Sequence, residues 1–469
     1  MVAGAQQGAA RQTQPPATSV AAREFARGIA LHREGKLEEA YRSYARALEL
    51  DPGHVDALNN MGVVLRAQGR IDAALAAYER GLALRPDDPG LLANLGSTLR
   101  AMGQHRKAVE VLHRAIALAP KAPGVHNNLG LVLRDLGHYE EALACFERSL
   151  EIWPNNLAVK LDRALTLLAK GDYPEGFRAL EARFEGDSGD TLVSGLPIWN
   201  GAHLRGRTLL VRAEQGVAEV LQFCRFVPLL QAAGGHLVLE CQPALLPLLR
   251  SLEGIDEIAA FDEHESAVDV QLPLLSVPRV VRVRPQDLPA KTAYLKAPER
   301  AGFVLMHPAK SRLSLGLIWG AQPEDGSRPA GSLTGPGLTP FFRLMRRPDV
   351  AVYALQRGES AREVKQLGAS GLLHDLSSFL TGLEDLARLM EQVDLIITAD
   401  STAAHLAGAL GRPVWLILPR DADWRWALAP DTTPWYPTMR LFRQPQSGDW
   451  PTIFEAVAEA LDQFAEAPR

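Results

Sequence analysis

The stretch from Ala57 to Gly90 reads ALNNMGVVLRAQGRIDAALAAYERGLALRPDDPG, and its pattern recurs every 34 residues through the first third of the chain. Four of its small or helix-breaking residues each belong to a series with this spacing. The series are Gly28, Gly62, Gly96 and Gly130; Gly35, Gly69, Gly103, Gly137 and Gly171; Ala40, Ala74, Ala108 and Ala142; and Pro52, Pro86, Pro120 and Pro154. Four series in one register indicate an array of structural repeats.

The spacing and the small-residue pattern are typical of tetratricopeptide (TPR) repeats, each of which is a helix–turn–helix unit. The first glycine and the alanine let the two helices approach closely, the second glycine suits a left-handed cap after the first helix, and the proline ends the second helix. Repeats are predicted at residues 23–56, 57–90, 91–124 and 125–158, and a degenerate fifth begins at Val159. We therefore expect an α-solenoid over residues 21–186 with a concave groove.

Asparagines occupy one position of the first helix in three repeats, at Asn60, Asn94 and Asn128. This position faces the concave surface, and a carboxamide can pair with both the N–H and the C=O of an extended peptide. The alternative is an ordinary polar residue on an exposed helix face. The ladder resembles that of eukaryotic O-GlcNAc transferase, a resemblance that implies a protein ligand.

Composition sets broad limits on the class of protein. At about 150 residues per domain, a chain of 469 residues predicts about three units. The net charge of -5 argues against nucleic acid or an acidic membrane as the partner. Three dispersed cysteines, Cys145, Cys224 and Cys241, predict neither a disulfide framework nor a zinc site. Residues 1–20 lack an apolar segment and are predicted to be a disordered leader, so we expect a cytoplasmic protein.

Beyond a linker around Gly186–Asn200, short apolar runs alternate with helical stretches. Strands are predicted at 208–212, 236–240, 314–320, 350–355, 395–398 and 414–418, and helices at 217–233 and 243–251. This alternation indicates βαβ units with parallel sheets. We expect two Rossmann-like domains, at 200–308 and 312–465, with a ligand cleft at the carboxyl ends of their strands.

Residues 400–411, DSTAAHLAGALG, have the form of a polar turn followed by a small-residue helix, directly after a predicted strand. Ser401 and Thr402 are expected to cap this helix. Its N–H groups and dipole would then form an anion site, with His405 one turn further pointing to the same place. The alternative is a capped helix packed closely on the sheet, with His405 as a structural residue.

Several motifs together resemble bacterial TPR-containing glycosyltransferases, which are similar to the heptosyltransferases of GT-B fold. The motifs are residues 400–411, Pro413–Trp415, Asp423–Trp426 and Pro434–Gln444 in the second half, and Ala213–Gly216, Leu221–Phe223 and Leu239–Pro243 in the first. The resemblance implies a nucleotide-sugar bound between the two Rossmann-like domains, with its diphosphate on the second domain. The nucleotide-sugar is a substrate, and no further cofactor is implied.

The resemblance also implies roles for individual residues. Its donor-binding positions correspond here to Trp319, Asp325, Arg328, Gln356, Asp400, Ser401, Thr402 and His405. A fixed guanidinium at Arg328 makes chemical sense, because departure of a nucleoside diphosphate builds negative charge. A protein held by the repeats, by family resemblance flagellin or another surface protein, is the implied acceptor.

One motif departs from the family. Where the family has Gly-Asp after Ala213–Gly216, with the Asp as the proposed base, this chain has Ala218 and Glu219. Glu219 is therefore the candidate base, although its carboxylate reaches about one methylene further. Two other hypotheses stay open. One is a TPR adaptor whose transferase half has lost its chemistry, and the other is a transferase for a lipid-linked or oligosaccharide acceptor.

A metal site is not predicted. The DxD string formed by Asp421 and Asp423 runs into a tryptophan-rich loop instead of ending a strand. Trp424, Trp426 and Trp435 have two interpretations, stacking on a base or sugar and a hydrophobic seal between the domains.

Overall fold

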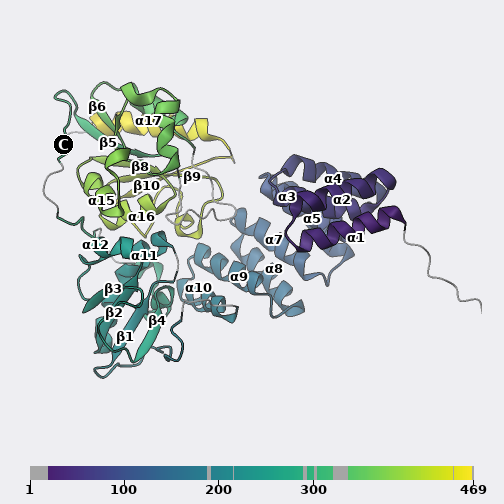
Figure 1. Ribbon diagram of the computed structural model, residues 1–469, viewed down its shortest axis with the longest axis horizontal. Helices are drawn as coiled ribbons and strands as arrows, with labels where there is room; N and C mark the ends of the chain where they lie inside the picture. The colour runs from purple at the N-terminus through teal and green to yellow at the C-terminus, as the bar shows by residue number, and fades with distance from the viewer. Residues whose placement is uncertain are drawn as a thin grey trace, which may run out of the picture. The chain divides into compact units, whose positions relative to one another are not determined.

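The computed structural model describes residues 19–186, 192–214, 216–288, 293–299, 304–320, 336–446 and 448–466. The chain divides into two compact units, Met1–Pro154 and Asn155–Arg469 (Figure 1). Within the described ranges, no helix is both long enough and apolar enough to cross a membrane.

The first unit consists of paired helices, as the repeat pattern predicts. Its helices are α1 (Val20–Arg33), α2 (Leu37–Leu50), α3 (Val55–Ala67), α4 (Ile71–Leu84), α5 (Pro89–Ala101), α6 (His105–Leu118), α7 (Pro123–Asp135) and α8 (Tyr139–Ile152). The first glycine series makes the pairing tight. A Cβ at Gly62 of α3 would lie 2.5 Å from the ring of Tyr78 in α4. The predicted solenoid of helical repeats is confirmed.

The second glycine series ends the first helix of each repeat. Gly69 has φ +75°, and its N–H donates to the carbonyl of Arg66 in the last turn of α3. A side chain with a Cβ rarely adopts this left-handed conformation, so glycine favours the turn into α4. The equivalent residues Gly35, Gly103 and Gly137 have φ values of 70–80°.

The predicted fifth repeat is a helix pair that belongs to the second unit. It comprises α9 (Leu157–Lys170) and α10 (Tyr173–Ala179), and a 3-10 helix (Leu180–Glu185) follows. Tyr173 and Phe177 of α10 are fully buried, and their rings pack against Trp424 at centroid distances of 6.0 and 6.1 Å. This degenerate repeat therefore packs on the α/β fold through aromatic side chains.

The amino-terminal lobe of this unit contains a four-stranded parallel sheet in the order β3-β2-β1-β4. Its strands are β1 (Thr208–Arg212), β2 (His236–Cys241), β3 (Glu257–Ala260) and β4 (Val270–Pro273). The helix predicted over 217–233 is wrong in its second half: α11 spans Val217–Phe223, and 224–233 is a 3-10 helix. Pro228 lacks an N–H, and in an α-helix its ring would clash with the carbonyl of Cys224, so the α-helix does not continue through this segment.

The carboxy-terminal lobe contains a six-stranded parallel sheet in the order β10-β9-β8-β5-β6-β7. Its strands are β5 (Leu313–Ile318), β6 (Val350–Ala354), β7 (His374–Asp375), β8 (Leu395–Ala399), β9 (Val414–Leu418) and β10 (Met439–Arg443), and its α-helices include α15 (Leu383–Glu391), α16 (Thr402–Ala409) and α17 (Trp450–Glu466). The predicted α/β class is confirmed. Connections leave β5 and β8 in opposite directions along the sheet, so a crevice is expected at their carboxyl ends.

Candidate functional site

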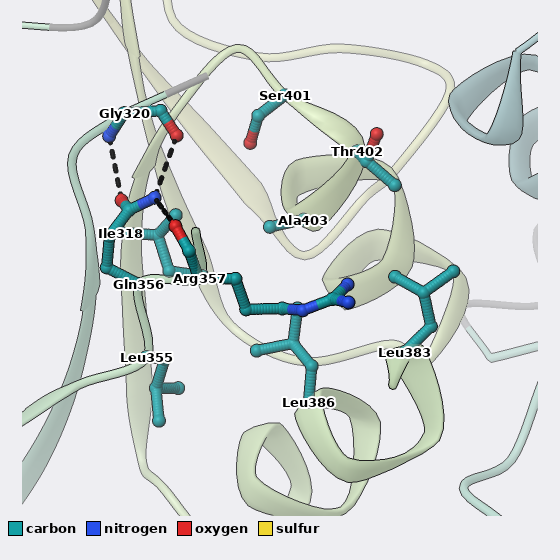
Figure 2. A pocket seen from close by; sticks show the side chains of 10 residues that line it. All are labelled: Ile318, Gly320, Leu355, Gln356, Arg357, Leu383, Leu386, Ser401, Thr402 and Ala403. Carbon is teal, nitrogen blue, oxygen red and sulfur yellow. Dashed lines mark hydrogen bonds between the residues drawn. The ribbon is translucent and has the colours of Figure 1, made fainter. Parts of the chain in front are cut away.

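A pocket lies where β5 and β8 end side by side. Gly320 follows β5 on its wall, and Ser401 and Thr402 follow β8 (Figure 2). The remaining lining residues are Ile318, Leu355, Gln356, Arg357, Leu383, Leu386 and Ala403, and the cavity volume is about 40 Å³. Ligands of open parallel sheets bind at such a switch point, so this pocket is the first candidate for a binding site.

Gln356, a predicted donor contact, uses its carboxamide on the backbone. Its Oε1 accepts from the N–H groups of Trp319 and Gly320 at 2.9 and 2.8 Å, and its Nε2 donates to the carbonyls of Gly320 and Arg357. The side chain is only 2% exposed. Gln356 therefore joins the loop after β5 to the loop after β6.

Trp319 is fully buried, and its Nε1 donates to the carbonyl of Ser360 at 3.3 Å.

Arg357, next to Gln356, was missed by the sequence analysis. Its side chain extends across the pocket, and its guanidinium lies between α15 and the start of α16 (Figure 2). The sequence did contain a signal, because Arg357 is a cationic residue only two positions after the end of a predicted strand. Periodicity alone does not show which of two adjacent residues turns into a pocket.

The wall opposite is the amino-terminal end of α16. Ser401 occupies the N-cap position, but the predicted side-chain cap is wrong: its hydroxyl donates to the carbonyl of Ala399 at 3.1 Å. Within the described part of the chain, no side chain accepts a hydrogen bond from the N–H of Thr402 or Ala403. First-turn N–H groups without a capping side chain, together with the helix dipole, favour an anion at this wall.

Asp400 lies half-buried beside this wall in a polar cluster. Its Oδ2 accepts from Nε1 of Trp426 at 2.9 Å. Burial, with the negative charges of Asp423 and Glu219 nearby, raises the pKa of Asp400 to about 6. Asp400 is therefore poised to change its protonation state close to neutral pH.

His405 lies deeper than its predicted role requires. It is 5% exposed, its Nδ1 is 2.8 Å from the hydroxyl of Tyr436, and its ring centroid lies 5.4 Å from that of Trp426. Burial and the charges of Arg425 and Arg225 hold the pKa of His405 well below its ordinary value. A neutral His405 offers no positive charge to an anion, and its packing matches the structural interpretation.

Glu219, the candidate base, lies in the first turn of α11 and pairs with Arg425. Nη2 of Arg425 is 3.4 Å from Oε1 of Glu219, and the carboxylate side chain is 24% exposed. Arg425 also bonds Asp423 at 2.9 Å and the carboxamide oxygen of Gln222 at 2.5 Å. One buried guanidinium thus holds α11 of the amino-terminal lobe against the loop after β9.

Two further predictions concern the tryptophan-rich loop. Trp424, Trp426 and Trp435 are all buried, as the interpretation of a hydrophobic seal requires. Asp423 of the DxD string bonds Arg425, and across the described residues no group of three or more His, Cys, Asp or Glu side chains is placed to hold a metal ion. The predicted donor contacts Asp325 and Arg328 lie outside the described residues.

The three asparagines of the predicted peptide ladder lie half-buried on α3, α5 and α7. Nδ2 of Asn94 donates to Oδ1 of Asn59 at 2.8 Å, and Nδ2 of Asn128 donates to the carbonyl of Ala93 at 3.2 Å. Both bonds join neighbouring repeats. Two of the asparagines therefore use N–H groups of their side chains to join neighbouring repeats. Peptide binding by Asn60, Asn94 and Asn128 stays a prediction.

Another contact missed by the sequence analysis reaches the loop before α11. Arg183, in the 3-10 helix after α10, donates to both carboxylate oxygens of Glu214. Glu214 also accepts from the N–H of Leu275, and its side chain is 3% exposed. The segment after the last helix pair thus fixes the loop between β1 and α11.

Comparison with protein families separates the two parts of the chain. Tetratricopeptide repeat models match residues 21–87, 56–121, 89–155 and 128–190. A model described as glycosyltransferase family 9 (heptosyltransferase) matches residues 380–417, which span α15, β8 and α16. The second match therefore covers the carboxyl end of β8 and the wall of the pocket.

Individual proteins resemble longer or shorter parts of the chain. Protein FlbA of Caulobacter vibrioides is 26% identical over 320 residues, covering 62% of this chain and 52% of that protein, so the chain spans about half the length of this relative. The crystal structure of MamA is 24% identical over 34% of this chain and 92% of its own, with a TM-score of 0.30. Pseudomonas aeruginosa PilF is 26% identical over 35% and 76%, with a TM-score of 0.33.

Proposed function

We propose that this TPR-containing, glycosyltransferase-like protein transfers a sugar from a nucleotide-sugar donor to a protein acceptor held by its repeats. The observation that carries the proposal is the pocket between β5 and β8. It combines the guanidinium of Arg357 with the amino-terminal end of α16. The carboxylates of Asp400 and Glu219 lie near enough to each other for the charge of one to alter the pKa of the other.

The donor would place its diphosphate between Arg357 and the first turn of α16. A guanidinium binds phosphate oxygens through charge-assisted hydrogen bonds, and the N–H groups of a helix terminus add further donors. Both groups would act more strongly as the sugar–phosphate bond breaks, because negative charge then accumulates on the departing diphosphate.

Transfer with inversion requires one carboxylate base and no covalent intermediate. In this proposal Glu219 accepts the proton of the acceptor hydroxyl while the acceptor oxygen bonds to the anomeric carbon. The electron pair of the breaking bond leaves with the nucleoside diphosphate. Arg425 would act as a positioning residue, since it holds the carboxylate of Glu219 at the junction of the two lobes.

The repeats would bind the acceptor. TPR units commonly present a concave surface to a protein ligand. The carboxamide oxygens of Asn94 and Asn128 are available to accept from a peptide backbone, because the bonds between repeats use their Nδ2 groups. A surface protein such as flagellin is the acceptor that the family resemblance suggests.

Donor binding tests the proposal directly. UDP-, GDP-, ADP- and CMP-sugars would be titrated by calorimetry into the full chain, into Arg357→Gln and into Arg362→Gln. Arg362 is a matched control, since it is exposed and pairs with Glu359 outside the pocket. One donor should bind, and Arg357→Gln should weaken it about 10- to 100-fold, the effect of losing one hydrogen bond to a charged group. Binding of no donor, or equal loss in both variants, would overturn the proposal.

An adaptor without transferase activity is the second candidate, and one observation favours it. Glu219, which replaces the aspartate of the related enzymes, is engaged with Arg425 and is not an unpaired carboxylate. The two functions are separated by assaying acceptor binding and sugar transfer on the same preparation. An adaptor would bind its protein partner and show neither donor binding nor transfer.

A further inference from the structure

A second pocket in this unit is lined largely by arginines. It lies between α10 and the segment 279–284, which begins at the end of α13 (Val277–Val280). Its volume is about 790 Å³, and its lining residues are Pro174, Arg178, Arg279, Val281, Arg282 and Arg284. Four of these six side chains are guanidinium groups, and no carboxylate is among them.

Nearby acids pair with two of these arginines. Arg178 pairs with Glu175, and Nε of Arg279 is 3.1 Å from Oε2 of Glu181. Arg282 is exposed, and no carboxylate of the described residues lies within ion-pair distance of its side chain. The protein as a whole carries a net charge of -5, so the arginines are a local concentration of positive charge in an acidic protein.

The backbone at Arg282 has an uncommon conformation. Arg282 has φ +55°. This left-handed conformation is energetically unfavourable for any residue that has a Cβ. It lies between Arg279 and Arg284 in the sequence RVVRVR, in which alternate residues differ in burial: Val283 is buried, while Arg282 and Arg284 are exposed. The turn therefore directs several arginines of one short segment to one side.

We propose that this pocket binds a carboxylate-rich segment of the protein acceptor. Planar guanidinium groups pair with carboxylates through two hydrogen bonds at once, and several of them in one pocket suit a run of Asp or Glu side chains. The volume exceeds that of a single small anion and accommodates several residues of an extended chain. The choice of a protein ligand rests on the proposed function, in which the acceptor is a protein.

The experiment uses the full chain and labelled eight-residue peptides of Glu, Gln or Lys, with fluorescence anisotropy as the readout. The Glu peptide should bind, the other two should not, and its affinity should fall as salt rises. Arg282→Asn removes one charge and retains a residue that tolerates positive φ, so the fold is kept. We expect Arg282→Asn to weaken binding about three- to tenfold, and Arg178→Gln/Arg282→Asn to weaken it further. Arg362→Asn, which removes an exposed charge elsewhere, should have no effect.

Three results would overturn the inference: no binding of the Glu peptide, binding that the pocket variants leave unchanged, and tighter binding of single-stranded nucleic acid or anionic vesicles that Arg282→Asn abolishes. The nucleotide-sugar titration keeps this test separate from that of the proposed function. None of the pocket arginines lines the donor pocket, so Arg282→Asn should leave donor affinity unchanged. If no donor binds and the Glu peptide still does, the transferase proposal fails and the acidic-segment site stands.

Discussion

Arg183 donates two hydrogen bonds to Glu214, from Nη2 to Oε1 at 2.9 Å and from Nε to Oε2 at 3.1 Å. Their side chains are only 10% and 3% exposed. Arg183 follows the helix pair that ends the repeat pattern, and Glu214 belongs to the loop that leads from β1 into α11. The ion pair therefore connects a segment of repeat origin to the helix that carries Glu219.

Loss of Arg183 should destabilise the second unit strongly. In Arg183→Met the carboxylate of Glu214 stays buried without its cation, and breaking a buried pair in this way costs about 3–5 kcal/mol. Lys160→Met is the control, because its partner Glu185 is half-exposed and such pairs contribute about 0–1 kcal/mol. Calorimetric melting of the full chain measures both effects. Equal shifts in melting temperature in the two variants would show that the Arg183–Glu214 pair contributes no more to stability than an exposed ion pair.

Glu219→Gln should separate chemistry from binding. The substitution removes the proton acceptor and retains the size of the side chain, and loss of a general base typically lowers turnover about 10²- to 10⁴-fold. Donor affinity should stay close to that of the wild type. Sugar transfer and donor titration on the same preparation provide the two readouts, and Glu219→Asp shows whether the shorter carboxylate serves. Unchanged turnover in Glu219→Gln would remove Glu219 from the mechanism.

The repeats could be predicted closely from the sequence because each series reports a feature inside one repeat: a close contact, a left-handed turn or a helix end. Gly62 and Tyr78 are 16 residues apart in the chain, and the missing Cβ of one accommodates the ring of the other. The central strands of the second sheet were predictable for a similar reason. Parallel strands buried on both faces are continuous apolar runs, as in Val414–Leu418, and their residues carry the signal by themselves.

The candidate site was less predictable because its contacts join distant parts of the chain. The sequence places Gln356 and Arg357 together at a strand end, but adjacent side chains of an extended segment point in opposite directions. Gln356 turned out to bond the backbone, and Arg357 extends into the pocket. Arg425 and Glu219 are 206 residues apart, and nothing in either local pattern indicates that they meet.

Asp400→Asn should stabilise the protein at neutral pH. Folding raises the pKa of Asp400 to about 6, so the folded state favours the protonated carboxyl. The stabilisation that this gives is fully present below about pH 4 and is lost as the pH rises through 6. Asn stays uncharged at every pH, and its oxygen still accepts from Trp426. The gain over wild type should therefore grow between pH 4 and 6 and level off above pH 7, at up to about 3 kcal/mol.

Thermal melting of both proteins from pH 5 to 8 measures this difference. His405 acts in the opposite direction, because its lowered pKa costs stability as the pH falls below its ordinary value, but both proteins contain it and the comparison largely removes its effect. A difference in melting temperature that stays constant across this range would mean that the charge of Asp400 is not the cause.

Gly62→Ala should destabilise the first unit, although alanine favours a helix. The added Cβ would lie 2.5 Å from the ring of Tyr78, which is fully buried, and such overpacking costs about 1–3 kcal/mol. Gly124 in α7 provides the matched control, because a Cβ there meets nothing within 4 Å. Gly124→Ala should be neutral or stabilising by up to about 1 kcal/mol. Helix melting followed by circular dichroism distinguishes the two, and a stabilising Gly62→Ala would show that the small residue is not required by the contact between α3 and α4.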